Sequence, residues 1–427
     1  MDINKNPFCP ILSVFILILL IFFSTHLFSE EIKPAFSEPL THPGRRVLQD
    51  RRKDKVNDLN HDRDKNKNKN KDTVVDKDRT DLKLGVTLMW DYDQFNGIHI
   101  NRKQKNYQVV NETELRRASI DIECEIDDDW QAEFQVSFED EDQSPEVEDA
   151  FISFTGWENF AFKIGQTKEP FGLEELTSSK QISLIERSMA TSAFAPGNHP
   201  GLEISGHQRP FTWAIGCYES EDNKNKRDSY ALTGRFVMTP WEYEERILHI
   251  GAAGSFRDFN GEEYKIETHA EVHTAEEIVR IVETQADEVQ LLGLELVSIL
   301  GPFSIQAEHM GAKIKATVGK DAFYSGYYIQ GSYFLTGETR SYKKGTFKSI
   351  KPLKTYGALE LLYRYSFLDA EDNNNGVRVS NHTLGANYYF NKWIRLMANY
   401  IKTTLVDGVS EVKCKADAIS FRMQFAF

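Results

Sequence analysis

The chain has 427 residues, a net charge of −14 and a mean hydropathy of −0.48. No apolar run reaches the roughly 20 residues that a membrane-spanning helix needs, so the composition argues against a helical membrane protein. It does not argue against a transmembrane β-barrel, because barrel strands are apolar only at alternate positions.

The first long feature of the chain is an apolar run from Ile11 to Phe23. Lys5 precedes it, and the small residues Ser24 and Ser29 follow it. This order is typical of a secretory signal, and we predict a signal peptide over residues 1–29. A true membrane helix is the alternative, but the run is shorter than a span requires.

Residues 30–81 are polar, and Lys and Asn alternate from Lys65 to Lys71 at their centre. Such a composition buries too little apolar surface to offset the entropy lost on ordering. We therefore expect a disordered periplasmic extension. A basic anchor to the anionic cell wall is the functional alternative.

From Leu82 onward, apolar and polar residues alternate with a period of two. In the clearest case Trp130, Phe134 and Phe138 share one face, whereas Glu133 and Gln135 lie on the other. The polar face is densely charged in many segments, as a water-filled lumen requires. A polar face open to solvent on a globular sandwich is the alternative.

Counting these segments gives sixteen candidate strands in residues 82–427. The fold class that we predict is therefore all-β, a transmembrane antiparallel β-barrel. The segments begin near Leu82, Leu115, Trp130, Glu148, Phe160, Gly201, Phe211, Tyr230, Arg246, Leu291, Phe303, Tyr324, Tyr356, Val379, Trp393 and Ala416.

The connections between these segments alternate in length, as even-stranded outer-membrane barrels require. The short ones are 127–129, 156–159, 207–210, 301–302 and 391–392. The long ones include 93–114, 167–199 and 259–288. The connection 340–355 is too long for its class. This parity makes 167–199 the third long loop, which we expect to fold inward.

The final segment alternates aromatic and apolar residues up to Phe427. A terminal Phe after such alternation resembles the insertion signal of outer-membrane barrels, so we assign Phe427 that role. The last strand of an ordinary sheet is the alternative.

The third long loop carries the most distinctive stretch, which begins at Gly165, breaks at Pro170 and Gly172, and ends in Thr177-Ser178-Ser179-Lys180 with Glu186-Arg187 beyond. It resembles the constriction loop of the phosphate-selective porin (O/P-type) family, whose pattern reads close to G-x-F-x-x-x-F-G-L-E-x-x-T-S-S-K followed by E-R. Further segments carry the resemblance in the same order: Trp90-Asp91-Tyr92, Leu115 to Ala118, Gly301 to Glu308, Gly326 to Tyr328, Leu335 to Arg340 and Tyr363 to Tyr365.

The resemblance implies a sixteen-stranded, homotrimeric porin of the outer membrane that passes phosphate or other oxyanions by basic residues lining the pore. Its partners would be outer-membrane lipids and small anions or other hydrophilic solutes, with no cofactor and no nucleic acid.

Strand parity points Arg117, Arg364, Arg395 and Arg422 to the lumen, whereas Arg116 falls on the opposite face and would lie at a rim. The resemblance adds Arg187, the arginine after the loop, and Lys180 of the Thr-Ser-Ser-Lys motif. It also matches Arg395 to a family pore lysine. An ion pair with one of the many lumen carboxylates is the alternative for each of these side chains.

Three departures from the family pattern weaken phosphate specificity. Thr167 replaces the first Phe of the loop pattern, and Glu175 stands where phosphate-selective members have a pore lysine. The run 264–273 carries Lys, Glu, His, Glu and His at alternate positions in place of arginines. We expect Glu175, in the same loop as Lys168, to lie at the constriction and blunt anion preference. The rival interpretation is that it pairs with Arg187 or Lys180.

We find no spacing that marks a nucleophile with its base or a metal site, so we predict neither an enzyme nor a metalloprotein. The cysteines Cys124, Cys217 and Cys414 lack ligand spacing. A porin of this fold without anion selectivity, a secreted all-β surface or adhesive protein, and an outer-membrane barrel enzyme remain the alternative functions.

Overall fold

The computed structural model describes residues 81–99, 109–138, 144–220, 229–243, 245–372, 375–410 and 412–427. The predicted signal peptide, 1–29, lies outside the described residues. So does the predicted extension, 30–81, except for Asp81, the first residue of β1. Among the residues described, no helix is long and apolar enough to cross a membrane.

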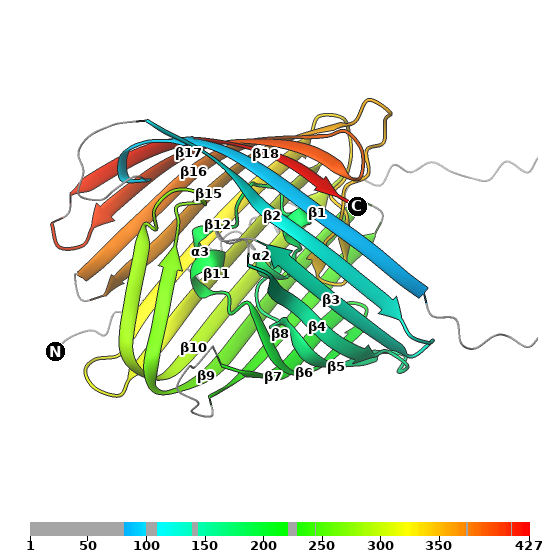
Figure 1. The fold of residues 1–427 in the computed structure, drawn as a ribbon, viewed down its shortest axis with the longest axis horizontal. Helices are drawn as coiled ribbons and strands as arrows, with labels where there is room; N and C mark the ends of the chain where they lie inside the picture. Colours follow the sequence, from blue (N-terminus) through cyan, green and yellow to red (C-terminus); the bar gives the residue numbers. More distant parts are fainter. Residues whose placement is uncertain are drawn as a thin grey trace, which may run out of the picture. The chain divides into compact units, whose positions relative to one another are not determined.

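Sixteen antiparallel strands form one closed barrel, which confirms the predicted fold class (Figure 1). The strands are β1 (Asp81–Phe95), β2 (Val110–Glu125), β3 (Trp130–Phe138), β4 (Glu146–Phe154), β5 (Phe160–Lys168), β6 (Asn198–Gln208), β7 (Phe211–Glu219), β8 (Tyr230–Tyr243), β9 (Arg246–Thr268), β10 (Val279–Leu300), β11 (Phe303–Ala316), β12 (Ala322–Phe334), β15 (Ala358–Asp372), β16 (Asn375–Tyr389), β17 (Ile394–Asp407) and β18 (Lys413–Ala426).

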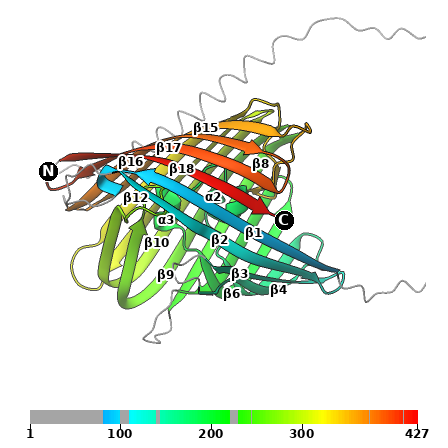
Figure 2. The ribbon, with the colours of Figure 1, turned by 45° about the horizontal axis from the view of Figure 1, so that its top comes forward.

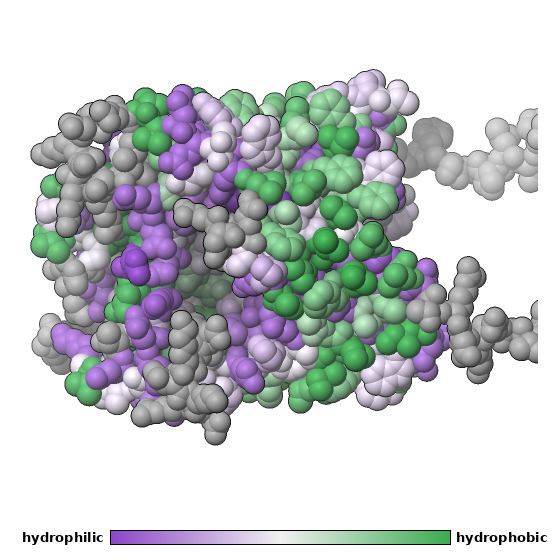
Figure 3. Space-filling view, in the orientation of Figure 1, coloured by the Kyte–Doolittle hydropathy of each residue, from purple (hydrophilic) through white to green (hydrophobic). Residues whose placement is uncertain are grey.

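The barrel closes where β1 pairs with β18, with Trp90 opposite Met423 (Figure 2). Closure gives every strand of the barrel a hydrogen-bonded neighbour on both sides, which is what a sheet in lipid requires. The side chains that alternate outward are apolar, and Trp130 and Phe134 are each about two-fifths exposed. Figure 3 shows such apolar side chains gathered over the half of one face that lies nearer residue 427.

The connections sort onto two ends of the barrel. The turn end carries residue 427 and all the predicted short connections, together with the long connection between β12 and β15; the loop end carries the others. One predicted long loop, 259–288, is wrong, because β9 continues to Thr268 and β10 begins at Val279. In this extension Tyr264 and Ile266 point inward and are buried, so the apolar face is inverted relative to an ordinary barrel strand.

Three connecting segments fold into the barrel. Loop 3 (169–197) carries α2 (Leu173–Leu176), the 3-10 turn η2 (Ser179–Gln181) and α3 (Met189–Phe194). Loop 5 (269–278) joins β9 to β10 at the loop end. The inward turn (335–357) joins β12 to β15 at the turn end and carries the hairpin β13 (Tyr342–Lys343) and β14 (Thr346–Phe347). The inward third loop was predicted and is confirmed. A further 3-10 turn, η1 (Gly97–His99), follows β1.

An apolar core lies inside the barrel, which the expectation of a polar, water-filled lumen does not anticipate. Met189 and Phe194 of α3 are fully buried and belong to one cluster with Phe171 and the inward side chains Ile314 and Val379. Helix α3 contacts β9, β11, β12 and β15. Loop 3 therefore packs against the wall formed by these four strands as part of a hydrophobic core.

Candidate functional site

Loop 3 begins with a sharp change of direction after β5. Pro170 has no N–H to continue the ladder, and Gly172 adopts φ 74°, a region that favours glycine. Phe171 between them is fully buried. Glu169 is held by Arg257 at 2.8 Å and His199 at 2.8 Å. These contacts fix the direction in which the loop enters the lumen.

The first turn of α2 is anchored on one carboxylate of the wall. Glu308 of β11 accepts hydrogen bonds from the backbone N–H groups of Leu173 (2.7 Å) and Glu174 (2.8 Å). The first amides of a helix lack partners within it, so a side-chain acceptor stabilises this end. Tyr328 donates its hydroxyl to Glu308 at 2.5 Å.

The entry into α2 gives a first prediction, because Gly172 holds a backbone conformation that other residues rarely adopt. A methyl group there would also lie 2.6 Å from Met310 Cε. We expect Gly172→Ala to lower the free energy of unfolding by about 1–2 kcal/mol, measured by urea titration in detergent. Gly331→Ala is the control, because Gly331 has ordinary φ and nothing within 4 Å of an added Cβ. Equal losses in both variants would contradict the prediction.

Helix α3 is capped from within the loop. Ser188 accepts a hydrogen bond from Thr191 N at its start, as N-cap residues do. Glu174 accepts from Ser188 N (2.9 Å) and from the hydroxyl of Thr191 (2.8 Å). A single carboxylate therefore joins α2 to α3.

The predicted lumen arginines of β15, β17 and β18 all bind loop 3. Arg364 pairs with Glu174 at 3.2 Å, and it donates to the Glu186 carbonyl. Arg395 donates to the Ile182 carbonyl at 2.8 Å. Arg422 pairs with Asp91 at 2.6 Å and with Glu186 at 2.6 Å. All three arginines are nearly fully buried, so each is placed as a loop anchor.

The prediction for Arg116 is wrong. Arg116 pairs with Glu186 at 3.1 Å inside the barrel, not at a rim. The cause is a β-bulge: Met89 of β1 lies opposite Arg117, but Asp91 lies opposite Glu114. The extra residue of β2 shifts its alternation. Arg116 therefore faces inward like Arg117, which donates to Ser179 of loop 3.

The remaining predicted residues form ion pairs within loop 3 and between loop 3 and the wall. Glu175 is 2.9 Å from Lys168 and 3.2 Å from Arg187. Lys180 pairs with Asp121 of β2 at 3.2 Å. Glu175 thus pairs with Arg187, as the rival interpretation required, and with Lys168 instead of Lys180. Its side chain is only 12% exposed, so any effect on a passing ion has to act through these neighbours.

The acids of loop 3 have perturbed ionisation. Burial would raise the pKa of Glu186, but the charges of Arg116 and Arg422 outweigh burial and hold this pKa well below its usual value. Burial likewise opposes the charges of Arg187 and Lys168 at Glu175, whose pKa is also lowered. Both carboxylates are therefore ionised at neutral pH.

These lowered pKa values predict how stability depends on pH. A carboxylate whose pKa is depressed on folding contributes stability above its unfolded pKa, and this contribution is lost as pH falls through the folded pKa. We expect the difference in unfolding temperature between wild type and Glu186→Gln to stay constant from about pH 8 to 5 and to shrink below about pH 4. A difference that shrinks between pH 7 and 5 would contradict this assignment.

Loop 5 is a second inward segment that the sequence did not predict. Glu271 pairs with Arg364 at 2.6 Å, and His273 lies 3.0 Å from Glu114. Thr274 donates to Asp93 at 2.9 Å. The alternating charges of the run 264–273 do not form a ladder, because Lys265 and Glu267 of β9 pair with Glu263 and Arg280 on exposed or half-exposed surface.

The inward turn fills the other end of the lumen. Tyr342 is hydrogen-bonded to His249 of β9 at 2.6 Å. Arg235 of β8 donates to the Gly345 carbonyl at 2.9 Å and pairs with Glu295. Phe347 is buried against Leu173 of α2. The inward turn thus packs directly on loop 3.

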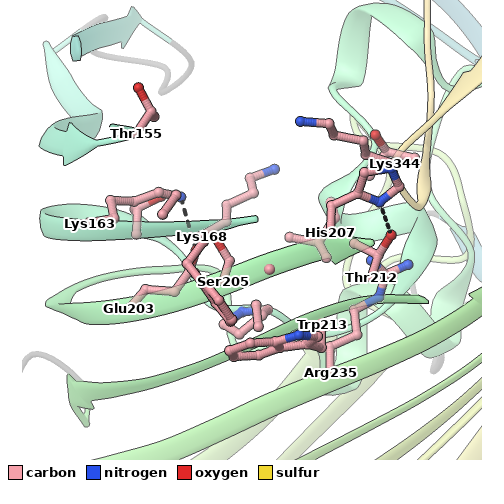
Figure 4. A pocket seen from close by; sticks show the side chains of 18 of the residues that line it. Thr155, Lys163, Lys168, Glu203, Ser205, His207, Thr212, Trp213, Arg235 and Lys344 are labelled. Atoms are coloured by element: carbon pink, nitrogen blue, oxygen red, sulfur yellow. Dashed lines mark hydrogen bonds and ion pairs between the residues drawn. The ribbon is translucent and has the colours of Figure 1, made fainter. Parts of the chain in front are cut away.

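Two cavities flank the inward turn. The larger, of about 610 Å³, lies against β3 to β8; Figure 4 shows Lys344 and His207 facing Lys163 across it. We call it the wall cavity. The smaller, of about 300 Å³, lies against β16 to β18, and we call it the seam cavity. Lys168 lines the wall cavity, whereas Lys180 and Arg395 line the seam cavity.

Sequence reasoning missed the cations that line these cavities from the inward turn, among them Lys344 and Lys348. The anomalous length of 340–355 was the only indication that this connection does more than reverse the chain. Within the described part of the chain, no group of three or more His, Cys, Asp or Glu side chains could hold a metal ion.

Comparison with known proteins places this architecture in a family. The family model described as "Phosphate-selective porin O and P" matches residues 82–427. The chain is 27% identical over 393 residues to Porin O of Pseudomonas aeruginosa, covering 81% of this chain and 88% of that protein.

Solved structures share the fold at low sequence identity. An anion-selective porin from Comamonas acidovorans is 12% identical with a TM-score of 0.54, over 82% of this chain and 100% of that one. OmpT of Vibrio cholerae in a trimer form is 12% identical with a TM-score of 0.50, over the same shares. The chain therefore belongs to the family of phosphate-selective porins O and P, and it is a β-barrel channel of the outer membrane.

Proposed function

We propose that this porin passes small hydrophilic solutes, with phosphate and other oxyanions among them, through a lumen narrowed by loop 3 and the inward turn. The observation that carries the proposal is the seam cavity. Among the described residues that line it, five are cationic and none is Asp or Glu: Lys180, Lys348, Lys351, Lys392 and Arg395. A patch of one sign raises the local concentration of the opposite ion.

The chemistry of this cationic lining suits an anion in transit. Side-chain ammonium groups are hydrated and flexible, so they offset the loss of the anion's water without fixing its geometry. Two of the five also join loop 3 to the wall, because Lys180 of loop 3 pairs with Asp121 of β2 and Arg395 of β17 donates to the Ile182 carbonyl. An anion that enters the seam cavity would therefore meet loop 3 directly.

In this proposal the other predicted cations shape the constriction and do not contact the anion directly. Arg364 and Arg422 are buried in ion pairs, so we assign them to shaping the constriction. Arg117 is partly buried and donates to Ser179 of loop 3. Arg187 is a partly buried residue of loop 3 that pairs with Glu175. The insertion role of Phe427, 62% exposed beside Trp393, also stays a proposal.

A homotrimer is the assembly that we propose. Strands β3, β4, β5 and β7 have nine residues each, the least that crosses a bilayer, whereas β9 and β10 have 23 and 22. A section of wall built from such short strands suits contact with neighbouring copies of the chain. The similarity to a porin that is known in a trimer form supports this assembly. Chemical cross-linking in detergent would test it.

The experiment for selectivity is the reversal potential of the purified channel in a planar bilayer, with chloride and phosphate compared. We expect the sign of the reversal potential to indicate a preference for anions. We expect the double variant Lys351→Gln, Lys392→Gln to shift the reversal potential toward the value for cation preference. A cation-side potential in the wild type would instead indicate a porin without anion selectivity.

A further inference from the structure

The wall cavity keeps opposite charges apart at its two sides. Three of its cations are neutralised within the protein: Lys163 by Glu203 (3.4 Å), Lys168 by Glu175 (2.9 Å) and Arg235 by Glu295 (2.6 Å). Five lining charges have no ion-pair partner within 4.0 Å among the residues that the structure describes: Glu133, Asp149, Glu158, Lys344 and Lys348.

The acidic side of the cavity lies on β3 and β4. Glu133 of β3 forms no hydrogen bond or ion pair with any described residue, and Asp149 of β4 repels it. Glu123 and Asp121 of β2 add to this repulsion, and Lys163 of β5, which is paired with Glu203, offsets part of it. Carboxylates that crowd one another favour the arrival of a cation, because a positive charge relieves their repulsion.

The basic side lies on the inward turn. Lys344 and Lys348 flank the short strand β14, and the turn is fixed by the hydrogen bond from Tyr342 to His249. Lys348 is repelled by Lys343 and attracted by Glu133, so the two unpaired groups act on each other across the cavity. A fixed separation of charge of this kind would orient a dipolar solute.

We propose that the wall cavity selects zwitterionic solutes of amino-acid size, with the ammonium group toward Glu133 and Asp149 and the carboxylate toward Lys344 and Lys348. A cavity of about 610 Å³ is large enough for such a molecule. A solute that carries both charges gains attraction at both sides, whereas an ion of either sign gains it at one side and meets repulsion at the other. The inference rests on the proposed function as a channel, and it names a solute class for a different part of the lumen.

Swelling of proteoliposomes tests the proposal with two solutes of similar size. γ-Aminobutyrate is the zwitterion, and erythritol is the neutral reference. We expect the wild type to admit γ-aminobutyrate faster than erythritol. Glu133→Gln and Lys348→Gln should each lower that ratio about threefold, because one screened charge is lost. Lys351→Gln, which lies on the same turn but lines only the seam cavity, should leave the ratio unchanged.

The double variant separates orientation from simple attraction. If one molecule engages both sides, the second substitution adds little once the first is present. An equal ratio in the wild type and the double variant would overturn the proposal, and so would a faster γ-aminobutyrate rate in Glu133→Gln. Failure of erythritol to enter would instead overturn the channel function itself. If either variant fails to fold, so that unheated and boiled samples migrate alike on a denaturing gel, Asp149→Asn and Lys344→Gln replace the pair.

Discussion

Replacement of Arg364 by methionine is expected to release loop 3 and loop 5 together. Arg364 is 1% exposed, pairs with Glu271 of loop 5 at 2.6 Å and with Glu174 of loop 3 at 3.2 Å, and donates to the Glu186 carbonyl at 3.0 Å. Methionine keeps much of the volume but leaves two carboxylates buried without their cation. Breaking a buried pair from one side costs about 3–5 kcal/mol.

The measurement is the free energy of unfolding in detergent, together with single-channel conductance. We expect Arg364→Met to lose stability and to conduct more, because both loops move away from β15. Lys83→Met is the matched control, since Lys83 pairs with Glu125 where both side chains are about half exposed. That variant should unfold and conduct like the wild type. Unchanged conductance in Arg364→Met would show that the loops are held by their apolar contacts instead.

Most of the barrel follows from local alternation. All sixteen strands were predicted because a period of two, with apolar residues facing lipid, repeats in every one of them. The exception is the outer part of β9 and β10. There Tyr264 and Ile266 face an apolar core inside the barrel, so the rule that polar residues face the lumen fails. That core exists because α3 covers it, a contact made by residues 70 or more positions away in the sequence.

The site was less predictable than the fold. Parity placed Arg364, Arg395 and Arg422 on the inner face, but no sequence rule tells a cation that meets a solute from one that binds a loop carbonyl. The difference depends on where loop 3 packs. The Arg116 prediction failed because a one-residue bulge reverses parity and leaves no distinct sequence mark. The inward position of loop 5 could not be predicted, because its anchors, such as Glu271, bind side chains from strands distant in the sequence.

Replacement of Glu175 by glutamine is expected to strengthen anion preference while leaving the loop in place. Glutamine keeps the shape of the side chain and removes the charge that neutralises Lys168 (2.9 Å) and Arg187 (3.2 Å). Lys168 is 23% exposed and lines the wall cavity. At about 6 Å and an effective dielectric near 20, one unit charge acts on a passing ion by roughly 3 kcal/mol before screening. Ions at physiological salt screen charges beyond about 8 Å, so only charges close to the passing ion affect it. Lys168 lines the wall cavity, so it is the side chain that transmits the change to the ion.

Glu175→Lys separates this electrostatic effect from a mechanical one. It places a third cation, on α2 itself, beside Lys168 and Arg187, and their repulsion should loosen the loop and raise conductance. If Glu175 governs selectivity through Lys168, the reversal potential under a salt gradient moves toward the anion side in both variants, and phosphate blocks chloride current more strongly. If Glu175 only holds the loop, Glu175→Lys conducts more at an unmoved reversal potential, and Glu175→Gln changes neither quantity. Because glutamine preserves the packing, a shifted potential at unaltered conductance in that variant would show that the carboxylate lowers anion preference by neutralising Lys168.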